Sequence, residues 1–177
     1  LGYTIFNLKD YTNAITHFKT FESDVANVRS EVMADARNRI ADCYYINTSY
    51  PMAIAYYDKV IDFGKVDADY AMFQKGSCLG LMNDLKGKAD VLSSLTTRYP
   101  SSSYVPSAIF ERGRAYLVLK TYSNAESDFN TVISSFPESP YVPRAIVQLG
   151  LLYSNTNQND KAIAQYKKVI EKYRSTP

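Results

Sequence analysis

The chain has 177 residues, of which 46% are hydrophobic and 21% charged, a composition typical of a folded rather than a disordered protein. Its 20 Lys and Arg nearly balance its 18 Asp and Glu, and a formal net charge of +2 argues against nucleic acid or an anionic membrane as partner. No run of about 18 apolar residues occurs, so the sequence contains no candidate membrane span.

The sequence repeats itself, most clearly between residues 99 and 146. Residues 99–109 read YPSSSYVPSAI, and residues 136–146 read FPESPYVPRAI. The offset is 37 residues at every matching position, and a period in this range is typical of a helical solenoid.

The repeat can be followed along the whole chain from one anchor position, with spacings of 39, 35, 37 and 37 residues. A small residue lies twelve positions before the anchor, and large residues lie nine before and four after it. Small residues let two antiparallel helices approach closely, and the large ones fill the space beside that contact. The anchors are Ala14, Ala53, Lys88, Ala125 and Ala162, and the small residues twelve before them are Gly2, Ala41, Gly76, Gly113 and Gly150. The large residues nine before the anchors are Ile5, Tyr44, Leu79, Tyr116 and Tyr153. The large residues four after the anchors are Phe18, Tyr57, Leu92, Phe129 and Tyr166.

This alignment predicts an all-α fold, a right-handed superhelical solenoid of antiparallel helix pairs in a single domain over residues 1–177. The predicted repeats cover residues 1–28 (truncated), 29–66, 67–101, 102–138 and 139–177. Leu1 and Gly2 fall in the middle of a first helix, so we expect the sequence to be a fragment of a longer protein.

Polar turns are predicted between the helices of a pair, as at residues 47–49, 83–84 and 155–159. Pro106 and Pro143 suit the first turn of a helix, and Ser103 and Ser139 are candidate capping residues upstream of them.

Two irregularities stand out. The 39-residue gap between the first two anchors predicts a longer connection or longer helices across residues 21–35. In the third repeat Lys88 replaces the anchor alanine and follows Gly87, which costs about 1 kcal/mol inside a helix relative to Ala. We therefore expect this repeat to be the most loosely packed.

The repeats resemble the tetratricopeptide repeat (TPR) family, with a small residue at the eighth position, Tyr at the eleventh, Ala at the twentieth, an aromatic residue at the twenty-fourth and Pro near the thirty-second. In the fourth repeat these residues are Gly113, Tyr116, Ala125, Phe129 and Pro137. The linker between repeats is further similar to that of bacterial cell-envelope TPR proteins, such as the Tol–Pal-associated periplasmic protein and the outer-membrane-assembly lipoprotein. This resemblance implies a non-catalytic interaction scaffold in the periplasm or cell envelope, with the cytoplasm as the alternative.

The residues offer no catalytic or metal-binding constellation. His17 is the single histidine, which precludes a His-based metal cluster, and neither a nucleophile elbow of the form G-x-S-x-G nor a Gly-rich phosphate loop is present. Cys43 and Cys78 occupy the same position in neighbouring repeats, where buried free thiols are favoured over a disulfide. We therefore expect no enzyme activity, no cofactor and no metal.

The resemblance implies that first helices line a concave groove, which would bind a protein or peptide partner. Counted from the anchors, the groove would grade from acidic through aromatic to basic, although Phe73, Phe110 and Leu117 could equally be core between repeats. The candidate groove residues are Asp35, Asn38, Asp42, Tyr45, Tyr70, Phe73, Ser77, Phe110, Arg114, Arg144, Val147 and Ser154, with Ser107, Leu117 and Leu151 at further groove positions.

The leading functional hypothesis is a protein–protein interaction scaffold that belongs to a larger bacterial envelope protein. The alternative is a sensor or docking segment of an enzyme whose catalytic domain lies outside this sequence. Self-association is a further hypothesis, because the ends of a solenoid expose the apolar faces that a next repeat would cover.

Overall fold

A computed structural model describes residues 1–24 and 31–173, and these residues form ten α-helices. The chain divides into two compact units, residues 1–87 and 88–177. The helices are α1 (Gly2–Asn7), α2 (Tyr11–Asp24), α3 (Glu31–Ile46), α4 (Tyr50–Phe63), α5 (Ala68–Leu81), α6 (Leu85–Arg98), α7 (Val105–Val118), α8 (Tyr122–Ser135), α9 (Val142–Asn155) and α10 (Asn159–Tyr173).

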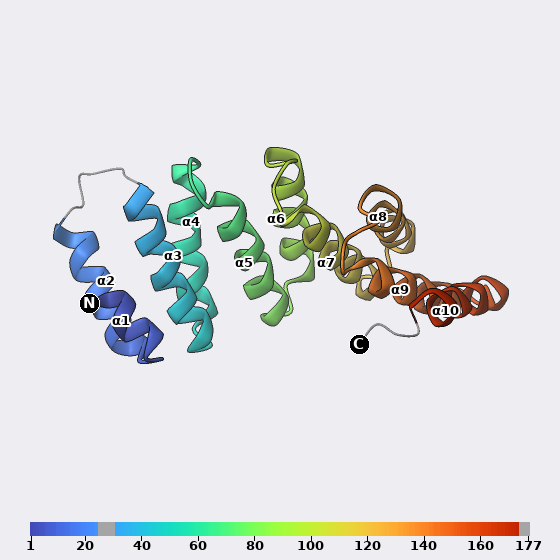
Figure 1. The fold of residues 1–177 in the computed structure, drawn as a ribbon, viewed down its shortest axis with the longest axis horizontal. Helices are drawn as coiled ribbons and strands as arrows, with labels where there is room; N and C mark the ends of the chain where they lie inside the picture. The colour runs from blue at the N-terminus through green and yellow to red at the C-terminus, as the bar shows by residue number, and fades with distance from the viewer. Residues whose placement is uncertain (25–30, 174–177) are drawn as a thin grey trace. The chain divides into compact units, whose positions relative to one another are not determined.

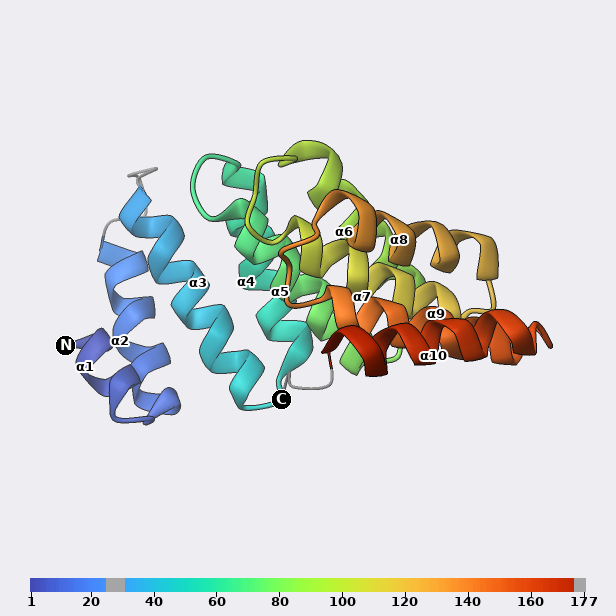
Figure 2. The same ribbon diagram turned by 45° about the vertical axis from the view of Figure 1, so that its right-hand side comes forward.

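Within each unit, helices that follow one another in sequence pack side by side. In residues 1–87, α2 packs on α1 and α3, and α4 packs on α3 and α5 (Figure 1). In residues 88–177, α8 packs on α7 and α9, and α9 packs on α10 (Figure 2). The predicted fold class, all-α with stacked antiparallel helix pairs, is therefore confirmed. Each range predicted for a repeat contains two of the ten helices, and the repeat boundaries themselves stay a prediction.

The aligned anchors mark equivalent places in the second helices. Those helices begin at residues 11, 50, 85, 122 and 159, so their spacings are 39, 35, 37 and 37, as predicted from the anchors. The four anchor alanines, Ala14, Ala53, Ala125 and Ala162, are all buried. At Gly113, a Cβ atom would lie only 2.8 Å from the ring of Phe129, which explains why the first helix carries glycine where it crosses the second.

The irregular spacing arises in α3, which confirms the longer-helix alternative of the prediction, although the helix runs beyond residue 35 to residue 46. First helices α3, α5, α7 and α9 begin at residues 31, 68, 105 and 142, a constant 37 residues apart. However, α3 has 16 residues where the other three have 14, which delays α4 by two residues. A shorter connection between α4 and α5, capped by left-handed Gly64, restores the period. Residues 25–30 lie outside the described part of the chain.

The five turns within helix pairs share one backbone conformation. Each places a non-glycine residue in the left-handed region, with φ between 52° and 63° for the six such residues described, Asp67 being the sixth. The turn residues recur at the spacing of the second helices and are Lys9, Thr48, Asn83, Lys120 and Asn157. The five turns thus have a left-handed residue at equivalent positions.

The connections between repeats also follow the doubled sequence. Pro106 and Pro143 lie in the first turns of α7 and α9, as predicted. The Oγ of Ser139 accepts a hydrogen bond from the N–H of Tyr141, and Ser102 does the same for Tyr104. The serine of the earlier connection is therefore Ser102 and not Ser103, since Ser102 is the residue 37 positions before Ser139.

The irregular third repeat is organised by local hydrogen bonds. Gly87 lies in the first turn of α6, and its N–H donates a 2.8 Å hydrogen bond to the carboxylate of Asp84. A Cβ atom on residue 87 would collide with that carboxylate, so glycine makes room for the cap. Lys88, in place of the anchor alanine, donates to Glu111 of α7 over 2.7 Å.

Candidate interaction surface

The candidate groove residues lie on four first helices, α3, α5, α7 and α9, and their burial differs strongly. On α3, Asn38 and Asp42 are buried, while Asp35 and Tyr45 are half-buried. Tyr70, Phe73 and Ser77 of α5 are half-buried. On α7 and α9, Phe110 is buried, whereas the exposed members are Arg114, Arg144, Val147 and Ser154.

Asp42 is the centre of a polar cluster inside unit 1. Its Oδ1 accepts 2.7 Å hydrogen bonds from the hydroxyl groups of Tyr57 and Tyr70, and Arg39 pairs with its Oδ2 at 2.6 Å. Burial raises the pKa of Asp42, against the opposing pull of Arg39 and the two tyrosines. The prediction that Asp42 is an exposed, acidic groove residue is therefore wrong, because its charge is used to join α3, α4 and α5.

Asn38, one turn before Asp42, is fully buried. Within the described residues, neither its amide nitrogen nor its amide oxygen has a hydrogen-bond partner. The prediction that Asn38 lines an open groove is also wrong, since no surface is left on its side chain for a partner to reach.

In unit 2, Phe110 belongs to the packing between successive repeats. Its ring centroid lies 6.0 Å from that of Phe129 and 5.2 Å from that of Tyr141. Arg144 of α9 places its guanidinium carbon 4.8 Å from the centre of the Phe110 ring. Leu117 and Ser107 are likewise buried. For Phe110 and Leu117 the alternative interpretation, core between repeats, is therefore the correct one.

The accessible part of the predicted groove is basic and aliphatic. Arg114 is exposed and pairs with Glu111 at 3.0 Å. Arg144, Val147, Leu151 and Ser154 form one exposed stripe along α9, at every third or fourth residue. The residues facing the other way on α9, such as Ile146 and Leu149, are almost fully buried. The side chains of this stripe are therefore accessible to a partner.

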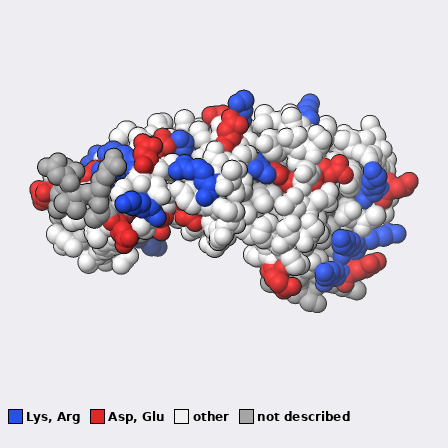
Figure 3. Space-filling view, turned by 90° about the horizontal axis from the view of Figure 1, so that it is seen from above, with Lys and Arg blue, Asp and Glu red and all other residues white. Residues whose placement is uncertain are grey.

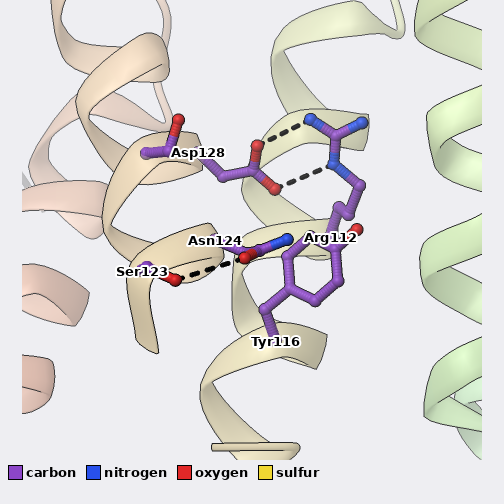
Figure 4. Close-up of a pocket in the computed structure, with 6 residues that line it drawn as sticks. Arg112, Tyr116, Ser123, Asn124 and Asp128 are labelled. Carbon is purple, nitrogen blue, oxygen red and sulfur yellow. Dashed lines mark hydrogen bonds and ion pairs between the residues drawn. The ribbon is translucent and has the colours of Figure 1, made fainter. Parts of the chain in front are cut away.

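A polar cavity of about 400 Å³ lies between α7 and α8 (Figure 4). Arg112 of α7 donates two hydrogen bonds to the carboxylate of Asp128 on α8, of 2.8 and 2.6 Å, and its remaining N–H group reaches Ser93 of α6 at 3.0 Å. This bonding raises the pKa of Arg112 and leaves its charge balanced. The other lining residues are Tyr116, Ser123, Asn124 and Ser127.

Sequence reasoning missed Arg112 and Asp128. The repeat pattern gives no signal for this pair, because the same two positions hold Leu149 and Gln165 one repeat later, and Lys75 and Val91 one repeat earlier.

The two cysteines are free and fully buried, as predicted. Burial raises the pKa of each thiol to about 12, which keeps both protonated and poor nucleophiles. Within residues 1–24 and 31–173, no group of three His, Cys, Asp or Glu side chains is arranged to hold a metal ion. Over the same residues, no helix is sufficiently long and apolar to cross a membrane.

Family models described as tetratricopeptide repeat match residues 70–102 and 143–172. No curated protein matches the chain.

Several solved structures share the fold. A crystal structure of MamA superposes with a TM-score of 0.83 at 19% identity, over 98% of this chain and 95% of that one. A tetratricopeptide repeat protein from Parabacteroides merdae gives 0.83 at 15% identity, over 99% of this chain and 65% of the other. YrrB, described as a TPR protein with an unusual peptide-binding site, gives 0.76 at 15% identity, over 99% and 84% of the two chains.

At these identities the likeness shows a shared fold. Residues 70–102 and 143–172 therefore match tetratricopeptide repeats, and the chain shares the fold of solved TPR proteins.

Proposed function

We propose that this protein is a non-catalytic scaffold that binds a protein or peptide partner through the exposed residues of its first helices. The observation that carries the proposal is the exposed stripe on α9, Arg144, Val147, Leu151 and Ser154, whose apolar members no described helix covers. A TPR fold commonly presents such helix faces to partners, and exposed aliphatic side chains beside a cation suit a segment with apolar anchors and a carboxylate.

The envelope of a bacterium is the location we propose for this scaffold. Support comes from the linker between repeats, residues 99–109 and 136–146, which resembles that of envelope TPR proteins. Osmotic-shock fractionation of the source cells followed by immunodetection tests this location. Recovery of the protein in the cytoplasmic fraction alone would refute it.

Capture of partners from an extract of the source cells tests the binding function. The purified chain, immobilised through its N-terminus, should retain a specific partner that is lost on Arg114→Glu or Val147→Glu. Asn130→Ala, an exposed change on α8, serves as the matched control and should retain the partner. Equal retention by all three variants would exclude the first-helix surface as the binding site.

A further inference from the structure

The polar cavity between α7 and α8 lies on a different side of α7 from the first-helix surface. Arg112 lines the cavity, and Arg114, two positions later, belongs to that surface. Residues two positions apart leave an α-helix on nearly opposite sides, because each residue turns the helix by about 100°. The cavity is therefore a second accessible place on unit 2, lined by Arg112, Tyr116, Ser123, Asn124, Ser127 and Asp128.

The tyrosines equivalent to Tyr116 use their hydroxyl groups to bond to the preceding repeat. Tyr44 accepts a 2.8 Å hydrogen bond from Lys19 of α2. Tyr153 donates a 2.6 Å hydrogen bond to Glu126 of α8. In both cases the partner lies on the second helix of the repeat before, so the tyrosine hydroxyl joins neighbouring repeats.

Tyr116 lacks such a partner. Its preceding second helix is α6, and the two equivalent positions there, counted from the anchors, hold Ser93 and Ala89. Alanine has no polar side-chain atom, and the Oγ of Ser93 accepts a 3.0 Å hydrogen bond from Arg112. Within residues 1–24 and 31–173 no hydrogen bond involves the hydroxyl of Tyr116, whose side chain lines the cavity.

Two other groups around the cavity are also available for hydrogen bonding. Among the residues that the structure describes, neither the Nδ2 of Asn124 nor the Oγ of Ser127 has a hydrogen-bond partner. Both residues are exposed and Tyr116 is half-buried, so a ligand can reach all three from solvent. In Figure 4 the side chains of Asn124 and Tyr116 extend toward one another from α8 and α7.

The charges at the cavity cancel. The guanidinium of Arg112 bonds to both oxygens of Asp128, at 2.8 and 2.6 Å, so neither charge is free to pair with a ligand. Figure 3 shows basic and acidic side chains interspersed on one face of the chain. With the two signs mixed in this way, long-range attraction for a ligand of one charge is weak. The cavity therefore suits a neutral ligand that hydrogen-bonds strongly.

We propose that the α7–α8 cavity binds a neutral carbohydrate, a function separate from that of the protein scaffold. Its volume of about 400 Å³ lies within the roughly 300–1,000 Å³ of small-molecule sites. Sugar hydroxyl groups both donate and accept hydrogen bonds, which matches the hydroxyl groups of Tyr116 and Ser127 and the amide of Asn124. The ring of Tyr116 supplies an aromatic surface against which the C–H groups of a sugar can pack.

Two other classes of ligand fit this cavity less well. Peptide recognition uses apolar pockets that hold anchoring side chains, and apart from the ring of Tyr116 the lining side chains of this cavity are polar. A phosphate group requires a cation that is free to pair with it, whereas Arg112 is already paired with Asp128.

Titration of the ¹⁵N-labelled protein, followed by amide chemical shifts, tests the ligand class and locates the site. The sugar probes are glucose, galactose, mannose, N-acetylglucosamine, maltose, cellobiose and lactose, and the comparison probes are inorganic phosphate and a neutral blocked glycine peptide. We expect saturable shifts centred on Tyr116, Asn124 and Ser127 with at least one sugar, at a Kd at least about tenfold below that of either comparison probe.

Three results of this titration would overturn the proposal. The first is a set of shifts that grow linearly without saturation for every sugar. The second is saturable shifts that centre on other helices. The third is tighter binding of phosphate or of the blocked peptide than of any sugar.

Variants assign the hydrogen-bonding groups. Tyr116→Phe and Asn124→Ala should each weaken sugar binding by about fivefold or more, since each removes one such group. The matched controls are Tyr141→Phe, another half-buried tyrosine of unit 2, and Asn130→Ala, another exposed asparagine of α8. All four variants keep the Arg112–Asp128 pair, and their amide spectra verify the fold. Unchanged affinity in both cavity variants would refute the site, as would losses as large in the controls.

Arg114→Glu separates this inference from the scaffold function. This variant should lose the protein partner captured from extract but bind the sugar with unchanged affinity, because Arg114 lies outside the cavity lining. Loss of sugar binding in Arg114→Glu, with an otherwise intact amide spectrum, would place the sugar on the first-helix surface and refute the cavity as its site.

Discussion

Arg112 and Asp128 join α7 to α8 by a two-point ion pair, with N–O distances of 2.8 and 2.6 Å. Asp128 is only 5% exposed. A bidentate pair of this kind fixes both the distance and the rotation of two helices, because each oxygen faces one nitrogen. It therefore holds α7 and α8 together at a place where the next repeat has the uncharged residues Leu149 and Gln165.

Removing one partner of this pair should destabilise the protein strongly. We expect Asp128→Ala to lower the free energy of unfolding by about 3 kcal/mol, because the guanidinium of Arg112 is left without its counter-charge. Urea denaturation measures the change, with Asn130→Ala on the same helix as a control that changes it by less than about 0.5 kcal/mol. A loss no larger than that of the control would show that the pair adds nothing to stability.

Glycine at position 113 permits the close approach of α7 and α8. In Gly113→Ala the new Cβ would lie 2.8 Å from Phe129 and 3.1 Å from the Cβ of Asp128. Since Phe129 is fully buried, its ring has no room to move, and we expect a loss of about 2 kcal/mol in thermal or urea unfolding. Gly150→Ala should cost less, because Tyr166 opposite it is half-buried and can shift. The reverse order would contradict this account.

The hydrogen bond from the N–H of Gly87 to Asp84 predicts that glycine at position 87 is more stable than alanine, which is the opposite of their helix propensities. Asp84→Ala should cost about 1 kcal/mol through loss of the hydrogen bond to the N–H of Gly87. Gly87→Ala in the Asp84→Ala background should then stabilise α6 by about 1 kcal/mol, because alanine favours the helix and no carboxylate opposes its Cβ. In the wild-type background the same change should instead lower stability, because the new Cβ collides with the carboxylate of Asp84. A double-mutant cycle measured by chemical denaturation decides, and additivity of the two changes would refute the coupling.

The left-handed turn residues differ in how well they suit that conformation. Thr48 has φ of 57° despite its β-branched side chain. We expect Thr48→Gly to raise the free energy of unfolding by about 1 kcal/mol, since glycine adopts positive φ without a steric cost. Asn83, at φ of 62°, tolerates this region, so Asn83→Gly should gain markedly less. Thermal melts of both variants compare them directly, and equal gains would contradict the steric explanation.

Glu111 should make stability depend on pH. Burial pushes the pKa of Glu111 up, but the hydrogen bond and charge of Lys88, with the charge of Arg114, outweigh it and the pKa is lowered. Because the pKa of Glu111 is lower in the folded state than its value of about 4.3 in the unfolded state, the ionised carboxylate stabilises the fold at pH values above about 4.3. This stabilisation is lost as the pH falls through the pKa of the folded state. Glu111→Gln should therefore cost about 1 kcal/mol at pH 7 and progressively less as the pH falls below about 4.3.

Urea unfolding of the wild type and Glu111→Gln across this pH range measures the difference, with Glu138→Gln, an exposed residue, as control. A cost that stays constant with pH would assign the role of Glu111 to packing rather than to charge.

The sequence alone determined the helix pairs and their spacing. The small residue at Gly113 and the large one at Phe129 recur once in each repeat, and this pattern reflects how one helix crosses its neighbour, which is local information. It also identified the anchor alanines from the alignment, and the free thiols of Cys43 and Cys78 because neighbouring first helices are expected to lie too far apart for a disulfide.

Only the tertiary structure decided which first-helix residues a partner can reach. Asp42 looked like an exposed carboxylate, but Tyr57 and Tyr70 donate hydrogen bonds to it from two other helices. Phe110 and Val147 occupy the same position of the repeat, yet one is 1% and the other 39% exposed. Exposure depends on which helix packs on a residue from the next repeat, and the pattern within a single repeat contains no record of that neighbour.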